Sequence, residues 1–173
     1  MLPRLLAIAL SASLPAAALA APSGRAVLRN ASGEEVATAT FKSSKGGVRV
    51  KVTAKSKFLT PGKHGVHIHA VGKCETPGFT SAGPHFNPEG KKHGLQSQAG
   101  AHAGDLPNLV VNAKGKGKLS FLAKGATLGD GTGSLFGPEG TAIVIHADPD
   151  DEKTDPSGNS GDRIACGVIQ KGT

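Results

Sequence analysis

The sequence predicts an all-β domain, built as a flattened barrel or a sandwich. Three observations predict it: short runs of alternating apolar and polar residues, no convincing helical pattern, and 25 Gly and 11 Pro in 173 residues. Frequent Gly and Pro indicate many turns, which favours short strands over long helices. Because the composition contains no Trp or Tyr and only six Phe, the core must come mainly from Val, Ile, Leu and Ala.

The periodicity indicates about eight strands, each bounded by turn residues. The predicted strands cover residues 26–28, 36–42, 48–52, 63–71, 109–111, 118–122, 141–145 and 164–170. A Lys/Gly turn suggests that the fifth and sixth of these form a hairpin. Residues 72–107 lose all periodicity, and a loop that long in a compact domain is either functional or disordered. Residues 147–163 form a second polar loop.

Residues 1–20 are expected to be a cleaved secretory signal peptide, which leaves a single domain over residues 21–173. Arg4 precedes an apolar run, and Ala18-Leu19-Ala20 has the small-x-small pattern of a cleavage site. A retained anchor or a buried N-terminal helix is the alternative, but the apolar run is short for a membrane span and is interrupted by Pro15.

Two cysteines, Cys74 and Cys166, are expected to form a disulfide, because exported proteins fold in oxidising compartments. Two free buried thiols are the alternative. A bridge across so long a loop would stabilise the fold by about 4–5 kcal/mol in the chain-entropy model.

Charge is unevenly distributed along the chain. The formal net charge is +7, which falls to +6 when Arg4 is removed, yet residues 148–163 hold six acids and two bases. The basic remainder would attract anions and could hold the protein near an anionic surface; lysines kept for solubility are the alternative. Lys114, Lys116 and Lys118 are interpreted as protecting a strand edge rather than binding polyanions. We expect no nucleic-acid partner.

Six of the seven histidines fall into one pattern, which we interpret as a two-metal site. Neutral imidazoles and a carboxylate are typical ligands of borderline divalent metals. His67 and His69 lie two residues apart on one strand, so their side chains share a face about 6.5 Å apart. His146, at the end of another strand, and His85, from the long loop, complete four imidazoles, a set suited to copper.

A second ligand set shares His85. With His93, His102 and Asp105 it gives three imidazoles and one carboxylate, a tetrahedral combination that zinc takes in closed sites. An imidazole that loses both ring protons binds one metal at each nitrogen and holds the ions about 6 Å apart. A single loop histidine is more often a solvated polar residue, so the interpretation depends on the whole set.

Four segments resemble the motifs of the copper/zinc superoxide dismutases: residues 65–69, 83–88, 100–108 and 158–167. The likeness covers nearly the whole chain after residue 20 and is weakest over residues 21–60. With the export signal, the chain resembles a bacterial secreted member located in the periplasm, with release outside the cell as the alternative.

This resemblance implies an eight-stranded Greek-key flattened barrel or sandwich with long metal-binding and electrostatic loops. The implied activity is that of an antioxidant oxidoreductase, which converts superoxide anion into oxygen and hydrogen peroxide with copper and zinc ions as cofactors, and so protects the cell envelope. It implies no stable membrane insertion. A homodimer is one of the oligomeric states that the family adopts, and the sequence leaves this state open.

Residue roles follow from the positions that match the family's motifs. The resemblance assigns copper to His67, His69, His85 and His146, and zinc to His85, His93, His102 and Asp105. It makes Cys74 and Cys166 the family disulfide, and Arg163 and His85 the catalytic residues, with Arg163 drawing superoxide toward copper. Behind the ligands, His64 matches a structural histidine, Asp150 a carboxylate that links a copper histidine to a zinc histidine, and Ser157 a channel hydroxyl.

Some alternatives stay open. Asp150 could be a solvated acid, and Arg163 could form a surface ion pair with Asp162, which stands where the family usually has a small neutral residue. Ala70 stands where a polar residue is common. A non-catalytic periplasmic copper/zinc carrier would fit every ligand but leaves Arg163 without a purpose. A structural sandwich held by zinc and a disulfide leaves the four-imidazole set unexplained.

Overall fold

A computed structural model describes residues 21–172, which form nine strands and one short 3-10 helix. In chain order these are β1 (Ser23–Arg29), β2 (Glu35–Ser44), β3 (Gly47–Lys55), β4 (Gly62–His69), η1 (Thr80–Ala82), β5 (Asp105–Val111), β6 (Lys116–Ala123), β7 (Ala142–His146), β8 (Arg163–Val168) and β9 (Gln170–Lys171). The signal peptide expected over residues 1–20 lies outside the described residues. In the part described, no helix has the length and apolar character needed to cross a membrane.

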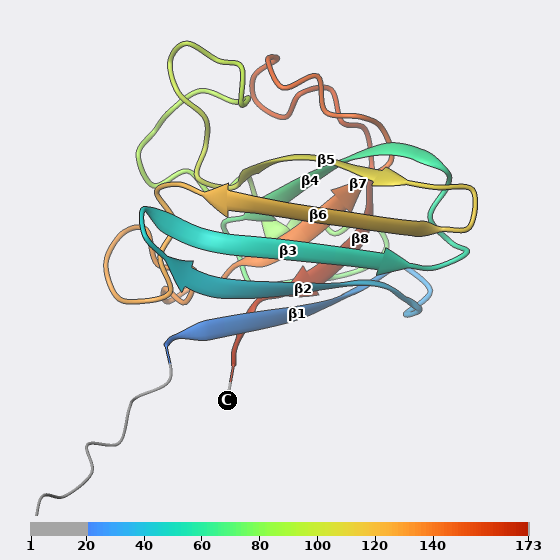
Figure 1. Ribbon diagram of the computed structural model, residues 1–173, viewed down its shortest axis with the longest axis horizontal. Coiled ribbons are helices and arrows are strands. Elements are labelled where there is room, and N and C mark those ends of the chain that lie inside the picture. The colour runs from blue at the N-terminus through green and yellow to red at the C-terminus, as the bar shows by residue number, and fades with distance from the viewer. Residues whose placement is uncertain (1–20, 173) are drawn as a thin grey trace, which may run out of the picture.

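The strands close into a barrel (Figure 1). Their order is β2-β3-β6-β5-β4-β7-β8-β1-β9, and β1 also pairs with β2, which joins the two ends of the sheet. The pairings of β3 with β6 and of β4 with β7 connect strands that are not consecutive in the sequence, as in Greek-key folds. The prediction of an all-β Greek-key barrel is therefore confirmed.

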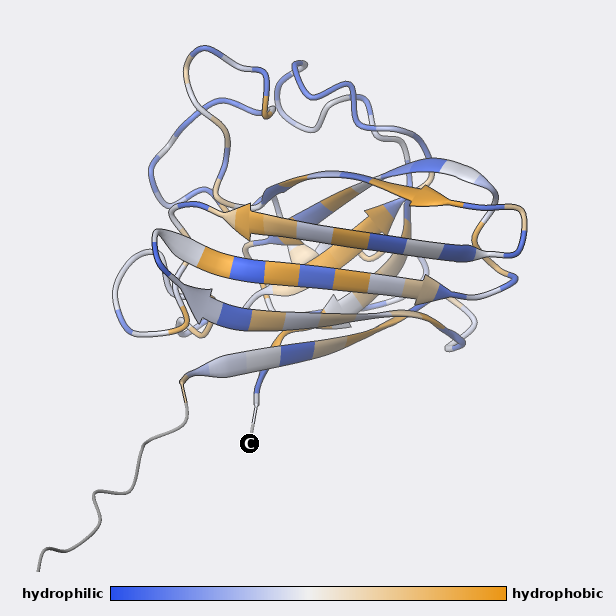
Figure 2. Ribbon diagram, in the orientation of Figure 1, coloured by the Kyte–Doolittle hydropathy of each residue, from blue (hydrophilic) through white to orange (hydrophobic). Residues whose placement is uncertain are grey.

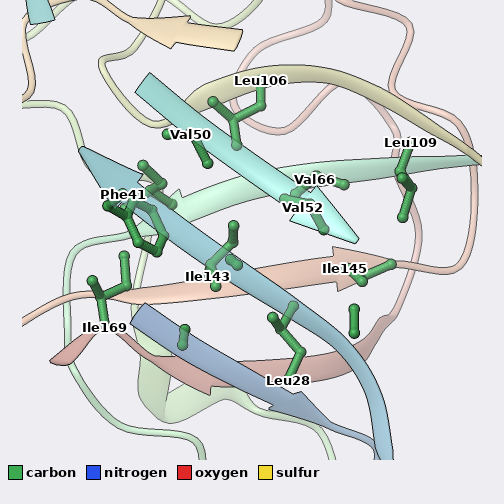
Figure 3. Packing of buried hydrophobic residues seen from close by; sticks show 14 of the residues in the cluster. Leu28, Phe41, Val50, Val52, Val66, Leu106, Leu109, Ile143, Ile145 and Ile169 are labelled. Atoms are coloured by element: carbon green, nitrogen blue, oxygen red, sulfur yellow. The ribbon is translucent and has the colours of Figure 1, made fainter. Parts of the chain in front are cut away.

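Alternation of apolar and polar residues places the core inside the barrel. In β3, Val48, Val50 and Val52 are buried, whereas Lys51 between them is exposed. Figure 2 shows the same alternation along β3 and its neighbours. Figure 3 shows the interior, where the labelled aliphatic side chains, Leu28 among them, belong to one core cluster with Phe41. As expected from the composition, Phe is a minor part of this core.

The predicted hairpin of residues 109–111 and 118–122 forms only at its turn. β5 and β6 pair at one position, Val111 with Gly117, whereas β6 pairs with β3 along its whole length. β5 instead pairs with β4 along most of its length, and it begins at Asp105, earlier than the sequence indicates. The last predicted strand is divided into β8 and the two-residue β9.

Candidate metal centre

The histidines of β4 and β7 lie on the outside of the barrel wall. Val66 and Ile68 of β4 belong to the core, so His67 and His69 point the opposite way. Both histidine side chains are nevertheless fully buried, because the loops over residues 70–104 and 147–162 cover this face. In Figure 1 parts of these two loops rise beside each other above β5 and β6. The candidate site therefore lies between the barrel wall and these two loops.

Four imidazoles converge in the first cluster, His67, His69, His85 and His146. Each offers one ring nitrogen, and these atoms all lie within 4.8 Å of one another. Within residues 21–172, the same four nitrogens are the buried side-chain atoms without a hydrogen-bond partner: His67 Nδ1, His69 Nε2, His85 Nε2 and His146 Nε2. Leaving even one such atom unpaired costs about 1–3 kcal/mol. Four lone pairs that converge in this way have the arrangement of a metal-ligand set.

Asp105 is the centre of the second cluster. Its Oδ1 lies 2.9 Å from His85 Nδ1, 3.1 Å from His93 Nδ1 and 3.2 Å from His102 Nδ1. The candidate ligand atoms within 4.8 Å of one another at this end belong to His67, His85, His93 and Asp105. His102, predicted for this set, is not in that group and adjoins it through Asp105. His85 belongs to both clusters, with Nε2 in the first and Nδ1 in the second.

Oxygen acceptors orient the rings of the first cluster. His69 Nδ1 donates to the Gly83 carbonyl oxygen at 2.8 Å, and His146 Nδ1 donates to the Gly161 carbonyl oxygen at 3.1 Å. His67 Nε2 contacts Asp150 Oδ2 at 2.7 Å. Each of these bonds holds the proton on one ring nitrogen, so the other nitrogen is left as a ligand.

Asp150 contacts one histidine of each cluster. While Oδ2 contacts His67, Oδ1 lies 3.0 Å from His93 Nε2. Asp150 is itself held by two bonds to Asn108, whose Nδ2 donates to the Asp150 carbonyl at 2.9 Å and whose Oδ1 accepts from its backbone N–H at 2.7 Å. The solvated-acid alternative for Asp150 is wrong, because the side chain is buried.

His64 lies behind the first cluster and ties two segments to β4. Its Nδ1 lies 2.8 Å from the carbonyl oxygen of His146, and its Nε2 lies 2.9 Å from that of Thr60. The ring thus positions the backbone of His146 rather than contributing to either cluster.

Two supporting residues were missed by the sequence analysis, Asn108 and Asp155. Asp155 Oδ1 accepts the His93 backbone N–H at 2.9 Å, and its Oδ2 accepts from Lys92 Nζ at 2.8 Å. Asn108 could have been singled out from its place in the motif of residues 100–108. Asp155 had no signal beyond its acidic loop.

Arg163 approaches the first cluster through the loop that precedes His85. Its two terminal nitrogens donate to the carbonyl oxygens of Phe79 at 2.9 Å and Gly83 at 2.8 Å. Since Gly83 also accepts from His69, a single oxygen positions both side chains. Within the described residues Arg163 forms no ion pair with Asp162, so that alternative is not borne out.

Ser157 lies in the loop over residues 147–162. It is half-buried in the loop that covers the site, and its carbonyl oxygen accepts from the Ser160 hydroxyl at 2.9 Å. Among residues 21–172, the Ser157 hydroxyl has no hydrogen bond to either cluster. Its role as a channel hydroxyl stays a prediction.

The sequence matches the family described as copper/zinc superoxide dismutase (SODC) over residues 36–169. The chain belongs to this family. Superoxide dismutase (Cu-Zn) 2 of Aquifex aeolicus is 48% identical over 147 residues, which cover 84% of this chain and 85% of the relative. Superoxide dismutase (Cu-Zn) of Caulobacter vibrioides is 39% identical over 151 residues, 86% of either chain.

Solved structures support the assignment to the copper/zinc superoxide dismutase family. The crystal structure of a SOD-like protein from Bacillus subtilis has a TM-score of 0.78 and 40% sequence identity, and covers 83% of this chain and 96% of that one. A double mutant of the same protein, with two introduced histidines, has 42% identity and a TM-score of 0.78. The fold and the family therefore agree.

Burial keeps most imidazole rings of this member of the copper/zinc superoxide dismutase family uncharged. It lowers the pKa of His67 to about 3, that of His69 to about 2 and that of His146 to about 4, and it also lowers the pKa of His85. Neutral rings have the lone pairs that a metal needs.

His93 behaves differently from the other imidazoles. Burial alone would lower its pKa, but hydrogen bonds to Asp105 and Asp150 outweigh that effect and raise it to about 9. Burial would likewise raise the pKa of Asp105 and of Asp150, yet their bonds to histidines hold both pKa values well below the usual range. Both carboxylates are therefore ionised at neutral pH, which gives the site two fixed negative charges.

The predicted disulfide of this family member is confirmed. Cys74 and Cys166 are bonded, with an S–S distance of 2.02 Å and a Cα–Cα distance of 5.6 Å. The bond ties the start of the long loop to β8, three residues after Arg163. It therefore fixes the segment whose carbonyl oxygens receive the Arg163 guanidinium.

Proposed function

We propose that this chain catalyses the dismutation of superoxide to oxygen and hydrogen peroxide, and that two ligand sets, which share His85, would hold a copper ion and a zinc ion. The observation that carries the proposal is the set of four converging, unpaired ring nitrogens, one of which belongs to a ring whose other nitrogen contacts Asp105. Family membership supports it, since the relatives from Aquifex aeolicus and Caulobacter vibrioides are named superoxide dismutases.

The proposed ligands follow from which nitrogen of each ring is free. Copper would be held by His67 Nδ1, His69 Nε2, His85 Nε2 and His146 Nε2, and zinc by His85 Nδ1, His93 Nδ1, His102 Nδ1 and Asp105 Oδ1. Four imidazoles suit copper, and three imidazoles with one carboxylate suit zinc.

When bound, copper supplies the one-electron oxidation and reduction of superoxide, while zinc supplies a fixed charge and an anchor for His85. Arg163 attracts the anion, because its half-buried guanidinium is permanently charged and lies next to His69. His85 Nε2 would hold one of the two protons that hydrogen peroxide needs and give it to the product, and the second proton would come from solvent. Asp105 keeps the ring oriented during this exchange.

A non-catalytic metal carrier is not favoured. A carrier has no use for a guanidinium held at the first cluster by two carbonyl oxygens. It also has no use for one imidazole common to two ligand sets, because such sharing makes release of either ion dependent on the other.

Replacing His85 by alanine tests the proposal. We expect the copper- and zinc-loaded variant to lose superoxide consumption while it stays folded and disulfide-bonded, because both the shared ring and its proton-holding nitrogen are removed. Gln98→Ala, an exposed change in the same loop, is the matched control and should leave the rate unchanged. Full activity in loaded His85→Ala protein would refute the proposal, as would electron paramagnetic resonance showing copper unaffected by the second ion.

We also propose that the protein is exported to the periplasm and that residues 1–20 are its signal peptide. Support comes from the Cys74–Cys166 disulfide, which needs an oxidising compartment, and from the bacterial relatives. Protein recovered from the periplasmic fraction of its host should begin at about Ala21 on N-terminal sequencing. A homodimer stays a prediction, which sedimentation equilibrium would check.

A further inference from the structure

The outer surface of four neighbouring strands is strongly basic. β1, β2, β3 and β6 contain eight basic residues and one acid, Glu35, which lies 3.8 Å from Arg29. Seven of these bases have no ion-pair partner within residues 21–172. We call these seven the basic face: Arg25, Lys42, Arg49, Lys51, Lys55, Lys116 and Lys118.

Strand register brings like charges directly opposite each other on this face. Lys42 is paired with Arg49, and Lys55 is paired with Lys116. Like charges in opposing positions destabilise a sheet, so this arrangement has a cost that solubility alone would not require. Protection of a strand edge does not explain it either, because β2 and β3 are paired on both sides.

One end of the basic face also exposes apolar side chains. An open groove of about 600 Å³ is lined by Thr53, Lys55, Val110, Lys116 and Lys118. Within the described chain, Val110 and Phe58 are the exposed large hydrophobic residues, at 58% and 45% exposure. The Ser56 N–H donates to the Gly115 carbonyl at 3.0 Å, which places the segment before Phe58 against the turn that leads into Lys116.

We infer that the basic face is a docking surface for an anionic phospholipid bilayer. Lysine and arginine side chains would contact headgroup phosphates, and Phe58 and Val110 would enter the boundary between headgroups and acyl chains. Single-stranded nucleic acid fits less well, because it is bound through aromatic platforms and the chain contains no Trp or Tyr.

This orientation leaves the metal centre accessible. The side chains of the basic face and those of the core alternate along β3, just as His67 and His69 alternate with core residues along β4. In the closed ring of strands, β2 and β3 lie across the core from β4 and β7, so the two outward faces lie on opposite sides of the core. A membrane that covers the basic face would leave Arg163 and the loops around it in solvent.

Vesicle co-sedimentation of the metal-loaded protein tests the inference. We expect binding to vesicles that contain phosphatidylglycerol, none to pure phosphatidylcholine, and weaker binding as salt is added. The double variant Lys51→Gln/Lys118→Gln should bind roughly 25-fold more weakly, because each base near an anionic surface contributes about five-fold. Lys73→Gln/Lys91→Gln removes the same net charge away from the basic face and is the control. Phe58→Ser should weaken binding by a similar factor at low and high salt.

Four results would overturn the inference. The first is equal binding to both kinds of vesicle, and the second is an equal loss in the two double variants, which would make net charge the sole cause. The third is displacement of the vesicles by an equivalent amount of duplex DNA, and the fourth is a second copy of the chain covering the face in solution. Superoxide consumption in free solution should be unchanged in Lys51→Gln/Lys118→Gln, so the outcome is independent of the proposed function.

Discussion

At the scale of single residues, two carboxylates make five contacts with imidazole rings. Asp105 holds three rings of one cluster through a single oxygen, and Asp150 reaches one ring of each cluster through its two oxygens. Because the oxygens of Asp150 are divided in this way, any movement of His67 is transmitted to His93. The affinities for the two metals should therefore be coupled.

Asp150→Asn tests that coupling. The amide keeps the size of the side chain but loses its charge, and an amide nitrogen cannot accept a bond from one of the two rings. We expect the affinities for copper and zinc both to fall by about 10–100-fold, the usual effect of removing a carboxylate behind metal ligands. Competition with a chelator measures the affinity for each metal. Asp130→Asn, an exposed change in another loop, should leave them unaltered; a loss confined to one metal would contradict the coupling.

Arg163→Ala should slow superoxide consumption without removing copper. Electrostatic attraction of a small anion commonly accelerates encounter by ten-fold or more, and the loss should shrink as salt is added. Stopped-flow rates at two ionic strengths, with copper content measured on the same samples, give the answer. Arg163→Lys should be intermediate, because it restores the charge but not the two-pronged contact with Phe79 and Gly83. Loss of copper from the alanine variant would instead make Arg163 a structural residue.

The ligand residues could be predicted because their types and spacing carry the chemistry. Their supporting contacts could not. The bonds from Asn108 to Asp150 join residues 42 positions apart, and that from His93 to Asp155 spans 62. Such contacts depend on how two loops pack, which no local pattern encodes. Arg163 could be predicted from its motif, whereas the carbonyl oxygens that it contacts could be identified only in the folded structure.

At the scale of elements, the two covering loops are held by close backbone packing as well as by ligands. Gly94 has a φ of +105°, and a Cβ there would lie 2.1 Å from the carbonyl oxygen of Glu152 in the other loop. A side chain at this position would therefore push the loops apart next to His93. The long segment without periodicity is thus ordered, as its candidate ligands suggested.

Removing the disulfide should destabilise the protein more than it alters the barrel. The bond closes a separation of 92 residues, so Cys74→Ser/Cys166→Ser should lower the unfolding free energy by about 4–5 kcal/mol in the chain-entropy model. Denaturant unfolding of metal-free protein measures this change. Wild-type protein under reductant is the control and should show the same loss. A difference below about 1 kcal/mol would mean that other contacts hold this loop.

Strands were predicted where one face is buried, because alternation then leaves a clear pattern in the sequence. β2 and β3 were found in this way, although both extend beyond the predicted residues. The pairing of β6 was not predicted, because a turn signal reports which strands are consecutive, not which are neighbours. The strand predicted at residues 109–111 is shorter than β5 for a related reason. Asp105 is polar and was assigned to the loop, yet it pairs with His67 in the sheet.

At the scale of the whole molecule, the buried imidazoles predict how metal-free protein responds to pH. His67, His69 and His146 have pKa values of about 3, 2 and 4 when folded, against 6.5 when unfolded. As the pH falls below 6.5, these three histidines bind protons in the unfolded chain but stay neutral in the folded chain. Folding stability should therefore fall from about pH 6.5 toward pH 4, by at most about 1.4 kcal/mol per pH unit for each group.

The contribution of His93 to folding stability depends on pH in the opposite direction. Its folded pKa of about 9 lies above 6.5, so its contribution is fully present below pH 6.5 and is lost as the pH rises through about 9. Metal-free protein should therefore be most stable near pH 6.5, as denaturant midpoints across this range would reveal. Adding both metals should raise the midpoint at every pH above about 5, since ions that bind only the folded state stabilise it. Rising stability from pH 6.5 down to 4 would contradict the assignment of buried neutral rings.

The hydrophobic interior and the ligand cluster are on opposite sides of one wall, β4 and β7, and they share no side chain. An assembly sequence follows from this division. The barrel can fold around its aliphatic core before the ions bind, and copper and zinc then bind in a separate, later step. When copper or zinc is scarce, folded but inactive metal-free protein would then remain, and it would bind the ions once they are available again.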